Sequence, residues 1–237
     1  MLTPVWYVLA APVAICLLIS VVLFMQVRML RRAKLERLPP AKVLKDRRRE
    51  PIEPTHAFTE PNGFEFQGYF ALTGVNGLIA AWQRADRPTF FCHYVLTAGN
   101  QLRTSFDFVT LFADEIGLTT GSNRDGHLMP RRPTSFLQTF SDRELEGLWA
   151  AHLETEEYLM DHGGARLVAM ETSFEEAFES SIRRSAEYVG SLPLWPLRGT
   201  YWYFVRRYAW HGLTVRQQHE RGWVKLPNAL AAAAGGQ

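Results

Sequence analysis

The sequence predicts an α+β domain behind a single N-terminal transmembrane helix, and three observations support this fold class. The first 27 residues carry no charged side chain. From Phe64 to residue 140, apolar side chains recur with a period of two, which is typical of β-strands. From residue 141 to residue 220 they recur at helical spacing. We therefore expect an antiparallel β-meander followed by two or three helices packed on the sheet.

The N-terminal apolar segment covers residues 5–25. As an α-helix these 21 residues extend about 32 Å, which is enough to cross the hydrocarbon core of a bilayer. A cleaved signal peptide is the main alternative, but it requires a basic start, a shorter apolar core and a small-residue cleavage site. The segment shows none of these, so a transmembrane anchor is expected.

Charge is unevenly distributed along the chain. Residues 28–49 hold ten Lys or Arg side chains and have a net charge of +8, residues 50–194 have a net charge of −11, and residues 195–237 have +5. Because basic flanks stay on the cytoplasmic side, we expect the N-terminus outside and the bulk of the chain in the cytoplasm. This places the protein in the cell membrane, or in the inner membrane of a bacterium. The acidic middle argues against nucleic acid as a partner.

The same patterns divide the chain into an anchor, a linker, a folded domain and a tail. The expected ranges are 1–27 for the transmembrane anchor, 28–61 for a basic and Pro-rich juxtamembrane linker, 62–226 for the cytoplasmic α+β domain (62–140 mainly β, 141–220 mainly α) and 227–237 for a flexible Ala/Gly tail.

The limits of the helices are predicted from capping signals. Ser141 and Ser173 each precede an acidic residue by three positions, as in a capping box that begins a helix. Gly163 and Gly164 are expected to end the first of these helices. A further helix is expected over residues 198–218.

A loop of basic residues is the first candidate site. It combines cationic side chains with glycines and prolines that could aim backbone amides at an anion. The candidate anion-binding residues are Arg124, Asp125, His127, Arg131 and Arg132. The alternative is an exposed turn centred on residues 125–126, without a ligand.

Two histidines are paired with acidic residues in the predicted elements. His152 and Glu156 stand four positions apart on a helix and could share a metal or a proton, or form a purely structural hydrogen bond. His93 and Asp107 lie on adjacent predicted strands and could form an acid/base pair or a structural one. No complete set of metal ligands, no cofactor motif and no catalytic residue is assigned from the sequence.

The segment YWYFVRRYAWHG, residues 201–212, mixes aromatic and basic side chains without an acid. Such a mixture is typical of a membrane interface or a protein interface, and the alternative is a helix whose aromatics pack on the sheet. The residues expected at a membrane or partner interface are Trp195, Tyr201, Trp202, Tyr203, Arg206, Arg207, Tyr208 and Trp210.

These features lead to two hypotheses about function. The first is a single-pass membrane-anchored protein whose cytoplasmic domain is a non-catalytic interaction or accessory subunit at the membrane surface. Its partners would be the lipid bilayer and another membrane protein or complex. The alternative is a membrane-tethered enzyme, a metal- or phosphate-handling hydrolase that uses the basic loop with His152 and Glu156.

Overall fold

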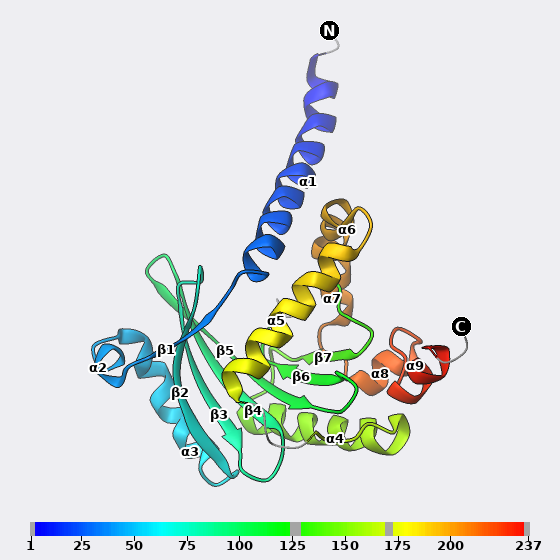
Figure 1. Cartoon of the computed structure of the whole chain (residues 1–237). Coiled ribbons are helices and arrows are strands. Elements are labelled where there is room, and N and C mark those ends of the chain that lie inside the picture. Colours follow the sequence, from blue (N-terminus) through cyan, green and yellow to red (C-terminus); the bar gives the residue numbers. More distant parts are fainter. Residues whose placement is uncertain (1–2, 124–128, 169–172, 235–237) are drawn as a thin grey trace.

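The computed structural model describes residues 3–123, 129–168 and 173–234. It has an α+β fold in which a seven-stranded sheet lies between helices, and a long N-terminal helix projects from one end of the domain (Figure 1).

The sheet follows the order of the chain, because each strand pairs with the next one in sequence. All neighbouring pairs are antiparallel except the last, which is parallel and is reached by a crossover after residue 121. The antiparallel meander is therefore confirmed for most of the sheet, and the parallel last strand was not predicted. The strands are β1 Leu35–Leu38, β2 Phe64–Leu72, β3 Gly77–Arg84, β4 Thr89–Ala98, β5 Gln101–Leu111, β6 Gly117–Gly121 and β7 Ser135–Thr139.

Residues 28–61 are part of the folded domain, so the interpretation of this range as a linker is wrong. It contains the edge strand β1 and the short helices α2 Pro40–Val43, η1 Arg47–Thr55 and α3 His56–Thr59. Val43, Ile52 and Phe58 are buried in one core cluster with side chains of β3 and β4. These apolar residues are separated by prolines and charges, so they show no period in the sequence, yet the sheet buries them one by one.

Strand β1 is bound by two acidic residues of the distant helix α5, Phe174–Ser191. The Arg37 guanidinium lies 2.7 Å from the Glu175 carboxylate, and the backbone N–H of Leu35 donates to Glu179 over 2.8 Å. These two contacts join the chain after the N-terminal helix to α5.

Helices cover both faces of the sheet (Figure 1). Helix α4, Leu145–Gly163, packs with α3 and η1 on the face that carries Phe91 and Phe108. Helix α5, Phe174–Ser191, packs on the opposite face, against Phe90 and Cys92. Strand β3 is consequently buried on both sides over most of its length.

The predicted helix limits are partly confirmed. Ser173 caps α5 by accepting from the backbone N–H of Glu176, and Gly164 ends α4 in the left-handed conformation with φ of 66°. The capping box at Ser141 is wrong, because α4 begins at Leu145 without a side-chain cap. The Ser141 hydroxyl instead lies 2.9 Å from the ring of His211.

The predicted helix over residues 198–218 is broken into pieces. Helices α6 Trp195–Tyr201, η3 Trp202–Arg206 and α7 Arg207–Trp210 run on from one another, η3 being a π-helix. Gly212 then adopts a φ of +79°, and its N–H donates to Thr139 of β7 over 2.8 Å. This backbone bond to the sheet turns the chain, and α8 Val215–Glu220 begins with its own capping box.

The predicted tail is helical over the part that the structure describes. Helix α9 covers Pro227–Ala234, and the side-chain amide of Asn228 donates to His162 of α4 over 3.0 Å. Four consecutive alanines favour a helix, and this propensity was underrated in the sequence.

Helix α1 covers Thr3–Leu30. Its residues Ala10–Leu30 are long and apolar enough to cross a membrane, and the described chain contains one such helix. The lower part of α1 packs against α5 and α6 and is the start of the folded body (Figure 1).

Replacement of Ile52 by alanine tests whether residues 28–61 belong to the domain. Ile52 is fully buried, so Ile52→Ala should lower the free energy of unfolding by about 2 to 5 kcal/mol, as measured by denaturant unfolding in mild detergent. Glu50→Ala is the matched control, because Glu50 is exposed and its loss should cost less than about 0.5 kcal/mol. Equal and small effects would mean that the segment is a linker after all.

Candidate functional site

His152 and Glu156 lie in a buried network of hydrogen bonds between α4 and the sheet. The Thr110 hydroxyl lies 2.8 Å from both His152 Nε2 and Glu156 Oε2, and His152 Nδ1 lies 2.9 Å from the Thr120 hydroxyl. Arg87 donates to Glu156 Oε1 over 2.8 Å. The network therefore joins β5 and β6 to α4, and its acidic residue is neutralised by an arginine.

The pattern of donors and acceptors in this network determines which nitrogen of His152 carries the proton. Thr110 has a single hydroxyl proton, which it donates to the acceptor-only carboxylate of Glu156. His152 Nε2 must then donate to Thr110, and Nδ1 accepts from Thr120. The imidazole is neutral, and burial together with the charge of Arg87 lowers the pKa of His152 to about 3.

The network is closed to solvent, since His152 is 0% exposed and Glu156 is 1% exposed. Within the described ranges no group of three or more His, Cys, Asp or Glu side chains could hold a metal ion. The geometry thus corresponds to the structural alternative for this pair, a hydrogen-bonded histidine inside the core.

His93 and Asp107 do not pair. The register of β4 and β5 sets Cys92 opposite Asp107 and His93 opposite Phe106, so the two side chains point to opposite faces of the sheet. His93 bonds instead to the Thr55 hydroxyl of η1 over 2.9 Å. The predicted acid/base pair is therefore wrong, because His93 is displaced by one residue from the position opposite Asp107 and so lies on the other face of the sheet.

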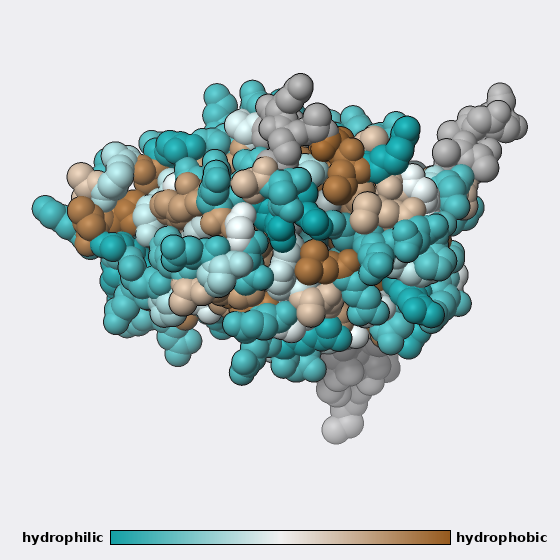
Figure 2. Space-filling model, turned by 90° about the horizontal axis from the view of Figure 1, so that it is seen from below, coloured by the Kyte–Doolittle hydropathy of each residue, from teal (hydrophilic) through white to brown (hydrophobic). Residues whose placement is uncertain are grey.

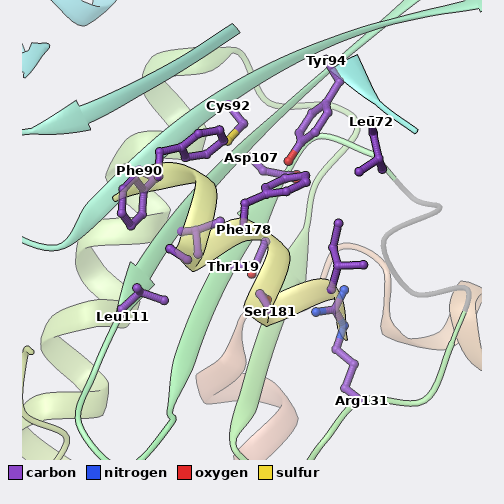
Figure 3. A pocket seen from close by; sticks show the side chains of 14 residues that line it. Leu72, Phe90, Cys92, Tyr94, Asp107, Leu111, Thr119, Arg131, Phe178 and Ser181 are labelled. Atoms are coloured by element: carbon purple, nitrogen blue, oxygen red, sulfur yellow. The ribbon is translucent and has the colours of Figure 1, made fainter. Parts of the chain in front are cut away.

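Asp107 lies in a cavity of about 360 Å³ between α5 and the sheet (Figure 3). Phe90, Leu111 and Phe178 supply part of the apolar wall. Tyr94 points its hydroxyl toward Asp107 in Figure 3 and hydrogen-bonds to it. The cavity is therefore apolar around a small polar floor, which is the usual composition of a small-molecule site.

Burial dominates the electrostatics of this floor. It raises the pKa of Asp107 to about 7, although the charge of Arg131 opposes the rise. It lowers the pKa of Arg131 to about 10 and raises that of the Tyr94 hydroxyl. Burial and the charge of Asp107 also raise the pKa of the Cys92 thiol, which stays protonated and is a poor nucleophile.

Gly121 on β6 allows this arrangement. A Cβ atom at Gly121 would collide with the Asp107 carboxylate, which is its partner across β5 and β6. The missing side chain leaves the space that the carboxylate occupies. Neither Asp107 nor Gly121 was assigned to a ligand cavity from the sequence, because the cavity depends on α5 crossing this face of the sheet.

The predicted anion-binding loop is only partly visible. Arg124, Asp125 and His127 lie outside the described residues. Arg131 lines the cavity beside Asp107, and Arg132 pairs with Glu115 over 3.1 Å. Arg131 lines the cavity on the α5 side of the sheet, whereas His152 is buried on the α4 side, so these two residues are not brought together.

The predicted interface residues are distributed over α6, η3 and α7. Trp195 is buried, Tyr201 and Tyr208 are exposed, and Trp202, Tyr203, Arg206, Arg207 and Trp210 are half-buried. Arg207 stacks on Tyr203 and Tyr208, with its guanidinium carbon 4.1 and 4.7 Å from the two ring centres. The aromatic and basic side chains of this segment therefore pack on one another, and some of them also face outward.

Helix α6 packs against α1, and this contact was missed in the sequence. Trp195 joins Leu23 and Val27 of α1 in one buried cluster. The hydroxyl groups of Ser20 and Thr200 lie 2.9 Å apart. A Cβ at Gly199 would approach Leu23 to 2.8 Å, so only glycine allows this distance between the helices. The small residues Ser20, Gly199 and Thr200 were the signal in the sequence from which this helix contact could have been predicted.

Comparison with protein-family models, with curated proteins and with solved structures found no match to this chain. The function is therefore inferred from the geometry of the molecule alone.

Asp107→Asn tests the buried carboxyl group through the pH dependence of stability. Between about pH 4 and pH 7 the folded protein keeps a proton on Asp107 that the unfolded chain has released, so stability falls as pH rises through this window. Asparagine does not titrate. The melting temperature of the variant minus that of the natural protein should therefore increase from pH 4.5 to pH 7.5.

The lowered pKa values of His93 and His152 produce the opposite trend, but they are present in both proteins and cancel in the difference. A difference in melting temperature that stays flat over this range would mean that Asp107 titrates normally and is not buried in the cavity.

Proposed function

We propose that this chain is a single-pass membrane protein whose cytoplasmic domain is a non-catalytic interaction or accessory subunit at the membrane surface. In this proposal α1 crosses the membrane with its N-terminus outside. The observation that carries it is the packing of α6 against the apolar part of α1. Because of that contact the domain is built onto its anchor, and the aromatic segment is held beside it.

The position of the contact along α1 sets the depth of the aromatic segment. Ser20 lies eight residues before Arg28, the first charge of the chain, which corresponds to about 12 Å along a helix. If Arg28 lies at the cytoplasmic interface, α6 and η3 reach into the inner leaflet. Aromatic and basic side chains at this depth bind to headgroups and to the acyl boundary.

Several of the exposed side chains of this segment are apolar. Leu197, Phe204 and Val205 are among its exposed side chains, and helix α1, against which α6 packs, also exposes apolar side chains. Exposed apolar side chains in this number are typical of contact with lipid or with another membrane protein. Tyrosine, tryptophan and arginine are also the side chains that contribute most to protein interfaces.

The opposite end of the domain supports the same orientation. Seen from the side remote from α1, the surface is mainly hydrophilic with scattered apolar residues (Figure 2). Most of the exposed large apolar side chains belong instead to α1 and to residues 194–208. The basic residues that follow α1 agree with a cytoplasmic location for the domain.

An interaction role is favoured over hydrolysis by where the reactive side chains lie. His152 and Glu156 are enclosed in the α4 network, and Arg131 is on the other side of the sheet. The side chains available to a partner are instead those of α6, η3 and α7. We accordingly expect the partner to be an integral membrane protein that contacts this surface.

Labelling of a cysteine at position 204 tests the depth of the segment. In a Cys16→Ser background, Phe204→Cys in native membranes opened on the cytoplasmic side should resist a membrane-impermeant maleimide and react only after solubilisation in SDS. Leu44→Cys is the matched control, since Leu44 is also apolar and exposed but distant in sequence from the segment, and it should react at once. Equal labelling at both positions would contradict the proposed depth.

Purification in mild detergent tests the accessory role. The natural chain should retain an integral membrane protein in stoichiometric amount, and Phe204→Asp should release it, whereas Leu44→Asp should not. Both positions are exposed, so neither change should lower the melting temperature much. A preparation without a partner, but with bound metal or a hydrolase activity that is lost in His152→Ala, would contradict the proposal and favour an enzyme.

A further inference from the structure

A second cavity, of about 410 Å³, lies where η3, α8 and the chain before β7 meet. Its wall includes the cationic residues Arg131, Arg132, Arg206 and Lys225, and no acidic side chain among the described residues lines it. Three tryptophans, Trp202, Trp210 and Trp223, complete the aromatic part of the wall. A cavity of this composition attracts an anion.

Arg206 is fixed in place by the tryptophans. Its guanidinium carbon lies 5.4 Å, 5.3 Å and 5.7 Å from the ring centres of Trp202, Trp210 and Trp223. Stacking of this kind holds the cation without neutralising it. The guanidinium is therefore preorganised, and an anion that binds to it loses little free energy in ordering the side chain.

Two of the other cations also have capacity for a ligand. Lys225 is exposed and forms no ion pair with the residues that the structure describes. Arg132 uses one terminal nitrogen for Glu115, but its buried Nε has no hydrogen-bond partner. A guanidinium and an ammonium group with free donors match the oxygens of a phosphate.

A buried hydrogen-bond acceptor in the cavity wall indicates that the ligand also carries a donor. The side chain of Gln218 is 1% exposed, and its amide nitrogen donates to Leu137 and to Leu213. Its Oε1 atom has no partner, although a buried acceptor without a donor costs free energy. A ligand that carries a hydroxyl group beside its phosphate would satisfy both Arg132 and Gln218.

The location of the cavity identifies the source of the phosphate. The five residues of η3 turn Phe204 and Val205 outward and place Trp202 and Arg206 in the cavity wall. If the outward side chains lie in the leaflet, as the proposed function has it, the cavity opens beside the lipid headgroups. π-Helices are often found at functional sites, because their wider turn redirects side chains.

We propose that this cavity binds the headgroup of an anionic glycerophospholipid that carries a free hydroxyl, with Arg132, Arg206 and Lys225 on the phosphate and Gln218 on the hydroxyl. The proposal rests on the proposed function for the membrane location. Binding is non-covalent and anchors the cytoplasmic domain to one class of lipid.

Lipid titration of the full chain in a neutral detergent tests the site. Short-chain phosphatidylglycerol should change the tryptophan fluorescence in a saturable way, since three tryptophans line the cavity. Phosphatidylcholine should not. Phosphatidylmethanol has the same phosphate charge without a hydroxyl and should bind several-fold more weakly. Equal binding of phosphatidylmethanol and phosphatidylglycerol would overturn the assignment of Gln218 to a headgroup hydroxyl.

The variant Arg132→Gln/Lys225→Gln should weaken phosphatidylglycerol binding roughly tenfold or more, the scale of one lost charged hydrogen bond. Arg166→Gln is the matched control, because Arg166 is exposed and lies outside the cavity, and it should bind normally. Unchanged affinity in the double variant would overturn the proposal, since the lipid would then bind elsewhere.

Glycerol phosphate, as a soluble probe, distinguishes a lipid site from a free-phosphate site. Binding of glycerol phosphate as tight as that of phosphatidylglycerol would overturn the lipid source. The cysteine labelling at position 204 is independent of this cavity. If that residue is protected in membranes but no lipid preference is found, the headgroup site alone is refuted.

Discussion

The contact between α1 and α6 is the constraint on which the arrangement of this protein depends. Gly199 permits the close approach, and the Ser20 and Thr200 hydroxyl groups satisfy one another between the two helices. Since α6 continues directly into η3 and α7, the same contact fixes the aromatic segment relative to α1. Helix α5 leads into α6 and also packs on the sheet, so α1, the aromatic segment and the sheet form one connected unit.

Electrostatics reinforces this arrangement in a way that segment charges do not reveal. The net charges of +8 and −11 suggested a basic tether and an acidic body held apart. In the folded chain Arg37 pairs with Glu175, and Glu179 accepts from the backbone at Leu35. The acidic residues of α5 thus hold β1 at the edge of the sheet. Surface pairs contribute little stability individually, and their main effect here is to fix the direction of the chain below α1.

Local signals in the sequence predicted the strands from Phe64, the starts of α5 and the end of α4, because turns, caps and periodicity depend on neighbouring residues. They did not predict β1 or the burial of Ile52, since an isolated apolar residue becomes a core residue only when a sheet from elsewhere covers it. The candidate sites likewise depend on contacts between segments that are distant in the sequence. Asp107 and Arg131 were visible as charged residues, but their shared cavity exists only because α5 crosses the sheet above Gly121.

Arg131 connects the two cavities of the molecule, because it lines both the one beside Asp107 and the one beside Arg206. Its partial neutralisation by Asp107 depends on the protonation of that carboxyl, whose pKa lies near 7. When Asp107 loses its proton, the attraction of Arg131 to the α5 side increases, and the positive potential of the tryptophan-lined cavity decreases. When Asp107 is protonated, this attraction is absent. The two cavities therefore share one side chain, and the protonation of Asp107 affects the electrostatics of both.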